Sequence, residues 1–332
     1  SALTFPLYEN GHEVRLVGSP LDDQVIDRLR EDNYHVNLLR TLHDGIHYYK
    51  ESEKEAAIQG ADLIVCGVSS FGVDWFADKI LPILDESVPV ISVTKGMLDY
   101  EDGTMQTYPE YWMSKLPEGS KQEIYAIGGP CTARDLADHD PSFVGYCGPK
   151  METLHWIRSL FATDYYVISL TLDVVGLECA VALKNGYALG TALAIGMAEK
   201  AGDDGINHNN SEAALFQESV KEMLDLLKIV GGGVDNIMYA AGDLNVTVAA
   251  GRSRTVGLLL GKGLSIDEVM EQLKGQTLEA VVIATRTARA VKALAKAGKV
   301  KESDFPLLMH VNALLNEGAT LNIPWTDFQK EM

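Results

Sequence analysis

Residues 176–198 read GLECAVALKNGYALGTALAIGMA, an apolar run that contains a single basic residue, Lys184. Leu177, Val181 and Ile195 share one helix face with Lys184, because the steps between them follow helical spacing. The segment therefore predicts a long helix that carries one ammonium group on an otherwise apolar surface.

That ammonium group is the most pointed chemical feature of the sequence. Burying a charge is costly, so Lys184 requires an acidic partner or a bound ligand. A lysine held in this way can donate or accept a proton, which makes it a candidate acid or base. Alternatively, its long stem carries the charge to solvent from a core helix. The residues alone leave both interpretations open.

The first half of the chain alternates short apolar, β-branched runs with helical or turn-rich segments. The runs are continuously apolar, which is typical of strands covered by helices on both faces. This pattern predicts an α/β fold, a Rossmann-like doubly wound parallel sheet. The expected strands are residues 12–17, 61–68, 88–93 and 125–127, with edge strands at 47–49 and 165–168.

The character of the chain changes near Thr171. From Asp173 onward the segments are long, rich in Ala and Leu, and periodic at helical spacing. A chain of 332 residues also exceeds what one hydrophobic core usually supports. We therefore expect two domains, an α/β domain over residues 1–171 and an all-helical domain over residues 172–332.

The sequence begins inside the expected α/β fold. A doubly wound sheet of this kind opens with a strand, a glycine-rich turn and a helix that binds a dinucleotide pyrophosphate. Residues 2–10 predict that helix and Gly11 its end, yet no G-x-G-x-x-G precedes them. The first strand and the glycine loop are absent from these 332 residues, and we expect them upstream of residue 1.

Composition and charge narrow the partners. Apolar residues make up 46% and charged residues 23% of the chain, which is ordinary for a globular protein and argues against disorder. A formal charge of −19 repels phosphate backbones and anionic lipid, so nucleic acid and membrane surfaces are poor partners. Any anionic substrate then requires a local basic pocket.

The sequence also bears on location and bonding. Its most apolar stretch is interrupted by Glu178, Lys184 and Asn185, so we expect no membrane insertion. The first residues offer neither a basic segment nor a cleavage site, which favours the cytoplasm. The four cysteines are scattered without a CxxC pair, and we expect no metal site and no disulfide framework.

A second chemical cluster lies in residues 242–257, GDLNVTVAAGRSRTVG. Asp243 follows a glycine. Arg252 and Arg254 flank Ser253 between two glycine-containing turns. Arginine side chains bind phosphate and carboxylate groups through two N–H donors at once. The alternative is a capping aspartate with two solvated arginines.

Two further segments follow strands of the first half. Lys95 lies near the carboxyl end of the apolar run 88–93, where open α/β sheets bind their ligands. Residues 128–135, GGPCTARD, predict a tight turn leading into a helix, a place where backbone N–H groups bind anions. Strand-end lysines and turns of this kind are common, so each segment alone is also consistent with a purely structural role.

Taken in order, these segments resemble the NAD(P)-dependent glycerol-3-phosphate dehydrogenase family. The resemblance covers nearly the whole chain, and it depends on the order of the motifs more than on any one of them. The matching stretches are ENGHEVRLVG (9–18), GADLIVCGVSSFGV (60–73), VPVISVTKGM (88–97), IGGPCTARDLA (127–137), ECAVALKNGYALG (178–190), GDLNVT (242–247), GRSRTVG (251–257) and GKGLSIDEVMEQLKGQTLEAV (261–281).

The resemblance implies a dinucleotide-binding Rossmann-like domain in residues 1–171 and a substrate-binding and catalytic domain in residues 172–332. It implies an oxidoreductase that transfers hydride reversibly between NAD, or NADP, and sn-glycerol 3-phosphate or dihydroxyacetone phosphate. Lys184 is then the acid/base at the substrate C2 oxygen, with Asp243 beside it. The implied substrate-binding residues are Lys95, Gly129, Cys131, Asn185, Thr247, Arg252 and Ser253, and the implied cofactor-binding residues are Phe71, Lys95, Ala133, Arg252 and Glu279.

Two positions depart from the family pattern, both on the substrate side. Ser253 stands where the family usually has an asparagine between two arginines, and Cys131 stands where bacterial members usually have threonine or serine. A thiol is a weaker hydrogen-bonding group than a hydroxyl. A dehydrogenase of the same architecture acting on another small hydroxy acid or polyol is therefore an alternative. The missing glycine loop suggests a second alternative, a non-catalytic cofactor-binding protein.

The segment GSPLDD, residues 18–23, bears on the choice of cofactor. It follows the strand at 12–17, contains no arginine to meet a 2′-phosphate, and offers two aspartates to a ribose 2′-hydroxyl. This favours NAD over NADP. From the family we further expect a homodimer that binds a small anionic substrate.

Overall fold

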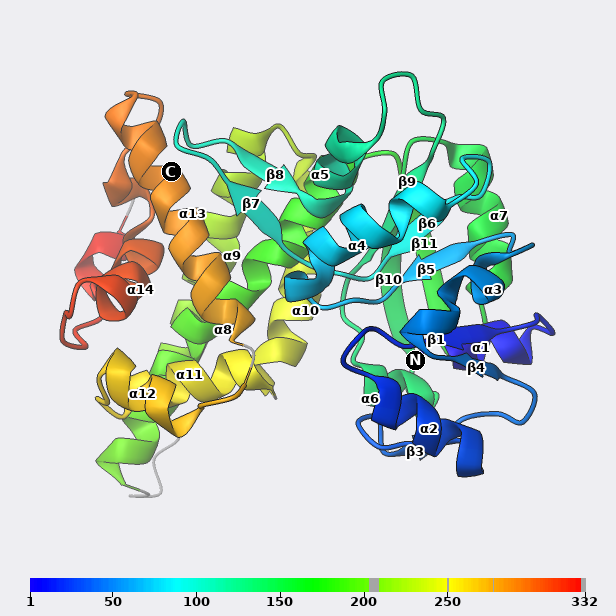
Figure 1. Ribbon diagram of the computed structural model, residues 1–332. Helices are drawn as coiled ribbons and strands as arrows, with labels where there is room; N and C mark the ends of the chain where they lie inside the picture. The colour runs from blue at the N-terminus through cyan, green and yellow to red at the C-terminus, as the bar shows by residue number, and fades with distance from the viewer. Residues whose placement is uncertain (203–208, 250, 277, 330–332) are drawn as a thin grey trace. The chain divides into compact units, whose positions relative to one another are not determined.

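The computed structural model describes residues 1–202, 209–249, 251–276 and 278–329 of the chain. The chain forms two units: unit 1 comprises Ser1–Lys95 and Tyr108–Val174, and unit 2 comprises Gly96–Thr107 and Val175–Met332 (Figure 1). The segment Gly96–Thr107 thus belongs to the second unit, whereas the sequence predicts a single boundary near Thr171. Ala250 of the cluster 242–257 and Thr277 of the matching stretch 261–281 lie outside the described residues.

Unit 1 is organised around a five-stranded sheet. Its strands, in their order across the sheet, are β11 (Tyr166–Thr171), β10 (Ser142–Cys147), β9 (Ile124–Gly128), β6 (Val90–Ser92) and β5 (Ile64–Cys66). β5 and β9 both run parallel to β6, but β10 runs antiparallel to β9. The sheet is therefore mixed: β5, β6 and β9 are parallel, as the sequence indicates, and the direction reverses between β9 and β10.

The connection between β9 and β10 accounts for the reversal. Its only helix within the described residues, α6 (Ala133–Ala137), has five residues and spans about 8 Å. That is too short to carry the chain back along a six-residue strand, as a parallel crossover requires. The strand at 142–147 is not among the strands that the sequence predicts.

Two small sheets and several helices complete the described part of unit 1. β1 (Arg15–Val17) pairs in parallel with β4 (His47–Tyr49), and β2 (Tyr34–His35) pairs antiparallel with β3 (Arg40–Thr41). The edge strand expected at 165–168 is present as β11 at one edge of the five-stranded sheet, whereas the strand expected at 47–49, β4, belongs to the separate two-stranded sheet with β1. The other helices are α1 (Thr4–Glu9), α2 (Asp23–Asp32), α3 (Lys54–Ile58), α4 (Val73–Lys79), α5 (Tyr108–Lys115) and α7 (Met151–Phe161).

Burial explains why the strands of the large sheet are apolar along their whole length. All five residues of β9 and all three of β6 are buried, although successive residues point to opposite faces. Helix α5 packs on β9 and helix α7 on β11. Continuous apolarity thus correctly indicates strands that are covered on both sides.

Unit 2 is built around the helix α8 (Val174–Ala201), as the opening segment of the sequence predicts. From Gly176 to Ala194, every residue of α8 except Lys184 is buried. Among the described residues, no helix has the length and apolarity needed to cross a bilayer. The other elements are α9 (Asn209–Val230), α10 (Ile237–Ala249), α11 (Arg252–Gly261), α12 (Ile266–Gln272), α13 (Glu279–Lys296), α14 (Pro306–Asn316) and a hairpin of β7 (Met97–Asp99) and β8 (Met105–Thr107).

Helices α8 and α11 touch backbone to backbone. A Cβ atom placed on Gly257 would lie 2.2 Å from the carbonyl oxygen of Leu189, and one on Gly261 would lie 2.3 Å from that of Leu193. From the other side, a Cβ on Gly196 would lie 2.1 Å from a carbonyl oxygen of α11. Only glycine permits this approach, and it fixes α11 against the helix that carries Lys184.

Candidate active site

The Lys184 side chain is enclosed and bonded at its tip. Its Nζ donates to Asp243 Oδ1 at 3.0 Å and to Thr247 Oγ1 at 2.7 Å. The Thr247 hydroxyl in turn donates to the backbone carbonyl oxygen of Asp243 at 2.7 Å. Asp243 and Thr247 lie four residues apart on α10, so they share the face that meets α8. The three residues form a closed triangle of hydrogen bonds.

Burial strengthens the electrostatic interactions within this triangle. The Lys184 side chain is 12% exposed and that of Asp243 is 3% exposed, so the pair is screened little by water. The structure therefore does not extend Lys184 into bulk solvent, the alternative that the sequence leaves open. An ammonium group held by an oriented carboxylate can donate a proton to an oxygen nearby and stabilise negative charge there. Asn185, the next residue, is buried at 6% exposure.

Three strand ends of unit 1 meet around Lys95. The carboxyl ends of the parallel strands β5, β6 and β9 lie at one edge of the sheet. Thr94 Oγ1, after β6, donates to the Val68 carbonyl oxygen, after β5, at 2.7 Å. Lys95 Nζ donates to the Gly129 carbonyl oxygen, after β9, at 3.1 Å. The structure thus brings Lys95 and Gly129 together, two residues that the resemblance assigns to the substrate.

The turn after β9 leads into α6. Gly129 has φ +121°, which residues with a side chain rarely adopt. Cys131 is partly buried, and its Sγ lies 3.8 Å from the carbonyl oxygen of Thr132. Thr132 caps α6 by accepting a hydrogen bond from the Asp135 amide at 3.2 Å. Ala133, which the resemblance assigns to the cofactor, is the exposed first residue of this helix.

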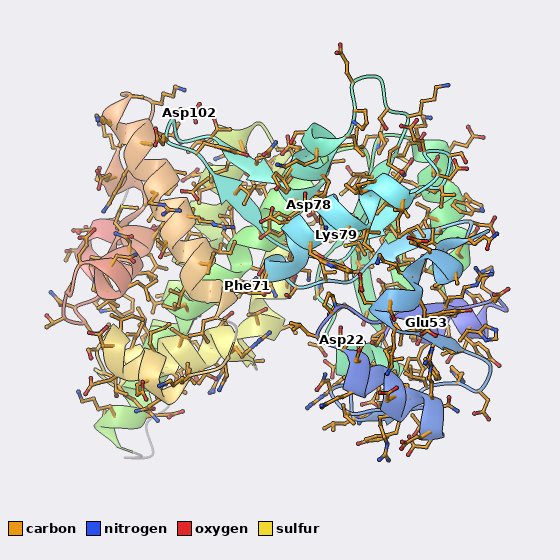
Figure 2. All side chains as sticks on the ribbon, in the orientation of Figure 1. Asp22, Glu53, Phe71, Asp78, Lys79 and Asp102 are labelled. Atoms are coloured by element: carbon orange, nitrogen blue, oxygen red, sulfur yellow. The ribbon has the colours of Figure 1, made fainter. Side chains whose placement is uncertain are left out.

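The remaining expected site residues lie at the starts of helices or turns. Arg252 is exposed and Ser253 is buried at the beginning of α11, after Gly251 with φ +113°. Glu279 is the partly buried first residue of α13. Phe71 is 67% exposed in the turn Ser70–Gly72 that precedes α4, and Figure 2 shows its side chain at that turn.

Sequence reasoning missed a buried carboxyl group near the middle of α9. Glu222 accepts hydrogen bonds from the Leu307 amide at 2.7 Å, the Leu308 amide at 3.0 Å and the Tyr187 hydroxyl at 3.0 Å. It thereby caps the first turn of α14. Burial raises the pKa of Glu222 to about 8. A local signal was present, because Glu222 shares the helical spacing of the buried Leu215 on α9.

The structure also bears on metal-type clusters and disulfides. Within them, no three histidine, cysteine, aspartate or glutamate side chains are arranged to hold a metal ion. Cys66, Cys131, Cys147 and Cys179 form no disulfide bonds.

The chain is similar to one family along nearly its whole length. The sequence model described as NAD-dependent glycerol-3-phosphate dehydrogenase N-terminus matches residues 1–152, and the one described as its C-terminus matches residues 173–324. The NADP(+)-dependent glycerol-3-phosphate dehydrogenase of Archaeoglobus fulgidus is 30% identical over 320 residues, covering 96% of this chain and 92% of that protein. The glycerol-3-phosphate dehydrogenase [NAD(P)+] of Bacillus pumilus is 26% identical, and the match covers 94% of this chain and 86% of that protein.

Solved structures share the fold. Glycerol-3-phosphate dehydrogenase from Coxiella burnetii matches with a TM-score of 0.78 at 23% identity, covering 98% of this chain and 93% of that chain. The enzyme from Plasmodium falciparum matches with a TM-score of 0.79 at 20% identity, covering 98% and 90%. The Rossmann-like first half with a mixed sheet and the helical second half are thus common to all three.

Proposed function

Because the chain belongs to the NAD-dependent glycerol-3-phosphate dehydrogenase family, we propose that it interconverts dihydroxyacetone phosphate and sn-glycerol 3-phosphate with a nicotinamide cofactor. The observation that carries this proposal is the enclosed Lys184 ammonium, 3.0 Å from Asp243 Oδ1 and 2.7 Å from Thr247 Oγ1. A positioned proton donor of this kind is what reduction of a ketone to an alcohol requires.

The residues of the chain handle the proton and the charge. In ketone reduction, Lys184 donates a proton to the oxygen on C2, and its positive charge stabilises that oxygen before transfer is complete. Asp243 keeps the ammonium oriented and charged, and the Thr247 hydroxyl fixes its second hydrogen bond. When bound, the nicotinamide cofactor supplies the hydride that reaches C2. The ketone, the hydride and the proton together give a secondary alcohol.

Cations and polar groups of the chain hold the substrate. Arg252 offers an exposed guanidinium at the N-terminal end of α11, where helix amides also favour a phosphate group. We propose that Lys95 provides a second cation. The proposed polar contacts around them are Gly129, Cys131, Asn185, Thr247 and Ser253.

The loops after β5 and β6 fit a nicotinamide cofactor. A Cβ at Gly67 would meet only Val93 Cγ2, at 3.9 Å, so the backbone there is open to a ligand, and the Phe71 ring is 67% exposed for stacking or apolar contact. We propose that Phe71, Lys95 and Arg252 contact the cofactor, together with Ala133 and Glu279. The carboxyl ends of these strands are where open α/β sheets bind such ligands.

NAD is the proposed preference. Asp22 follows β1, and its Oδ2 accepts hydrogen bonds from the Ser19 amide at 2.9 Å and hydroxyl at 2.5 Å. A carboxylate held there favours a ribose 2′-hydroxyl over a 2′-phosphate. Arg15, the nearest arginine before it in sequence, is engaged with Glu13 and two backbone carbonyl oxygens. The named relatives include an NADP(+)-dependent enzyme, so both cofactors belong in the test.

The test follows the absorbance of NADH and of NADPH when the full-length protein is mixed with dihydroxyacetone phosphate. We expect oxidation of the cofactor and formation of sn-glycerol 3-phosphate, faster with NADH. A panel of unphosphorylated ketones and 2-oxo acids serves as the comparison. Turnover of a panel member without turnover of dihydroxyacetone phosphate would favour another hydroxy substrate. Cofactor binding without any turnover would favour a non-catalytic protein.

We also propose that the protein works in the cytoplasm as a homodimer, as expected from the family. Light scattering after size-exclusion chromatography measures its mass, and a mass of one chain at working concentration would contradict the dimer. Fractionation of the source cells tests the location.

A further inference from the structure

The backbone that carries Lys95 continues directly into unit 2. The chain passes from unit 1 to unit 2 between Lys95 and Gly96 and returns after Thr107. Gly96 has φ +151°, which residues with a side chain rarely adopt. Met97, the first residue of β7, is 1% exposed within the core of unit 2. Met97, two residues after Lys95, is therefore anchored among the helices of unit 2.

Two arginines of α13 hold this strand. Arg286 Nη1 donates to the Met97 carbonyl oxygen at 2.8 Å. Arg289 donates twice to the Asp99 carboxylate, from Nε at 2.9 Å and from Nη2 at 2.8 Å. The Asp99 side chain is 10% exposed, and Arg286 Nε lies 3.8 Å from the same carboxylate. Two parallel hydrogen bonds fix both the direction and the distance of a contact, so β7 is clamped to α13.

The turn of the hairpin is seated on the same helix. A Cβ at Gly103 would lie 2.7 Å from Leu294 Cγ and 2.9 Å from the Ala290 carbonyl oxygen, so the turn touches α13 directly. These residues follow the two arginines at helical spacing and share their face. Figure 1 shows β7 beside α13, and Figure 2 labels Asp102 in the turn. Strand β7 and the turn of the hairpin are thus both attached to α13.

This attachment limits where Lys95 can lie. Two residues of extended chain span at most about 7 Å, so a fixed Met97 confines the Cα atom of Lys95 to a small volume. At the other end, Lys95 Nζ donates to the Gly129 carbonyl oxygen at 3.1 Å. Loss of the clamp would release the backbone on the C-terminal side of Lys95, while the hydrogen bonds of Thr94 on its other side and of its own Nζ stay in place.

We propose that Asp99, Arg286 and Arg289 are positioning residues: by clamping β7 to α13 they fix where the Lys95 ammonium meets the anionic substrate. The inference rests on the function proposed above, in which Lys95 binds that substrate. The three residues act through the backbone of Met97 and Gly96, without touching the substrate themselves.

Helix α13 offers a matched control. Lys292 Nζ pairs with Glu317 Oε1 at 2.5 Å, with side chains 40% and 49% exposed, and this ion pair joins α13 to the end of α14 instead of the hairpin. Arg289→Ala and Asp99→Asn should lower kcat/KM for dihydroxyacetone phosphate about ten- to hundred-fold, because misplacing a substrate-binding group by about 1 Å costs up to that much. Lys292→Ala should leave kcat/KM unchanged. Arg289→Lys, which keeps the charge but loses the paired donors, should fall in between.

A double substitution separates positioning from general stability. If the clamp acts through Lys95, Arg289→Ala should cause little further loss of kcat/KM in a protein that already carries Lys95→Ala. Full losses that multiply in the double variant would overturn the proposal, because the clamp would then act independently of Lys95. Thermal unfolding of each variant shows whether the fold survives.

Hydrogen exchange provides a readout that does not depend on turnover. Amides of residues 96–99 should exchange faster in Arg289→Ala than in the wild type, and at the wild-type rate in Lys292→Ala. Equal exchange in all three proteins would overturn the clamp. If the wild type reduces no ketone, the proposed function fails by itself, and the exchange rates still decide whether Arg289 positions this segment.

Discussion

The ammonium of Lys184 lies closer to the hydroxyl of Thr247, at 2.7 Å, than to the carboxylate of Asp243, at 3.0 Å. The Thr247 hydroxyl donates its own proton to the Asp243 carbonyl oxygen, so its lone pairs face the lysine. A neutral group with a fixed orientation therefore helps to hold the charged one. This makes Thr247 a sensitive place to test the triangle without removing a charge.

Thr247→Val should lower the free energy of unfolding by roughly 1.5–3 kcal/mol, because a hydrogen bond to a charged group is lost while the shape is kept. Turnover should also fall, since the ammonium gains freedom to move. Thr247→Ser keeps the hydroxyl and should recover both properties. Urea unfolding and steady-state kinetics measure them, and wild-type turnover in the valine variant would show that the hydroxyl is dispensable.

Lys184→Ala should reduce turnover by about 10²- to 10⁴-fold, the usual contribution of a positioned acid or base. Affinity for NADH should be retained, because the proposed cofactor residues are unchanged. Lys200→Ala, an exposed lysine in the last turn of the same helix, is the matched control and should keep full activity. Kinetics and fluorescence titration with NADH measure the two effects. Retained turnover in Lys184→Ala would refute the assignment of this lysine.

Glu222 should make stability depend on pH. Burial raises its pKa from 4.5 to about 8, so the folded protein keeps a proton that the unfolded chain releases. The stabilisation linked to this group is complete below about pH 4.5 and is lost as the pH rises through about 8. Glu222→Gln removes the titration while an oxygen can still cap α14.

The corresponding measurement is urea unfolding at several pH values across this range. Glu222→Gln should gain stability relative to the wild type as the pH rises. Glu212→Gln, on the same helix, is the comparison. A constant difference between wild type and Glu222→Gln at every pH would show that the carboxyl group does not titrate in this window.

Gly257→Ala should destabilise unit 2 by about 1–3 kcal/mol, because the added methyl group would force α8 and α11 apart. Its Cβ would lie 2.2 Å from a backbone oxygen that cannot move alone. Gly67→Ala is the control, since its nearest neighbour would be a side-chain atom at 3.9 Å. Thermal unfolding of the two variants gives the comparison, and equal midpoints would mean that the helices tolerate separation.

The sequence predicts the parts of the molecule that local pattern controls. Helical spacing around Lys184 correctly indicates α8, and continuous apolar runs correctly indicate β5, β6 and β9. Asp243 and Thr247 are four residues apart, so a helix alone places them on one face. Their contact with Lys184 joins positions 59 and 63 residues apart, and no local pattern contains that information.

What the sequence misses depends on packing between distant segments. β7 and β8 are strands of three residues each, too short for an alternating pattern to stand out, and Asp99 finds its arginine 190 positions later. The spacing of Glu222 places it on an apolar face, but the helix end that it caps lies 85 residues further on. The antiparallel strand β10 depends on the shortness of α6, which the GGPCTARD turn does not reveal.

The interleaved course of the chain has a consequence for anyone who wishes to dissect the protein. A fragment that ends at residue 171 would keep the hairpin 96–107 but lose helix α13. Met97, which is 1% exposed in the intact chain, would then face water, and Asp99 would lose its arginine partners. Dividing the chain at a single position therefore does not give two intact units. A fragment that contains unit 1 would need a short linker in place of residues 96–107. A fragment that contains unit 2 would need residues 96–107 joined to it as an added segment.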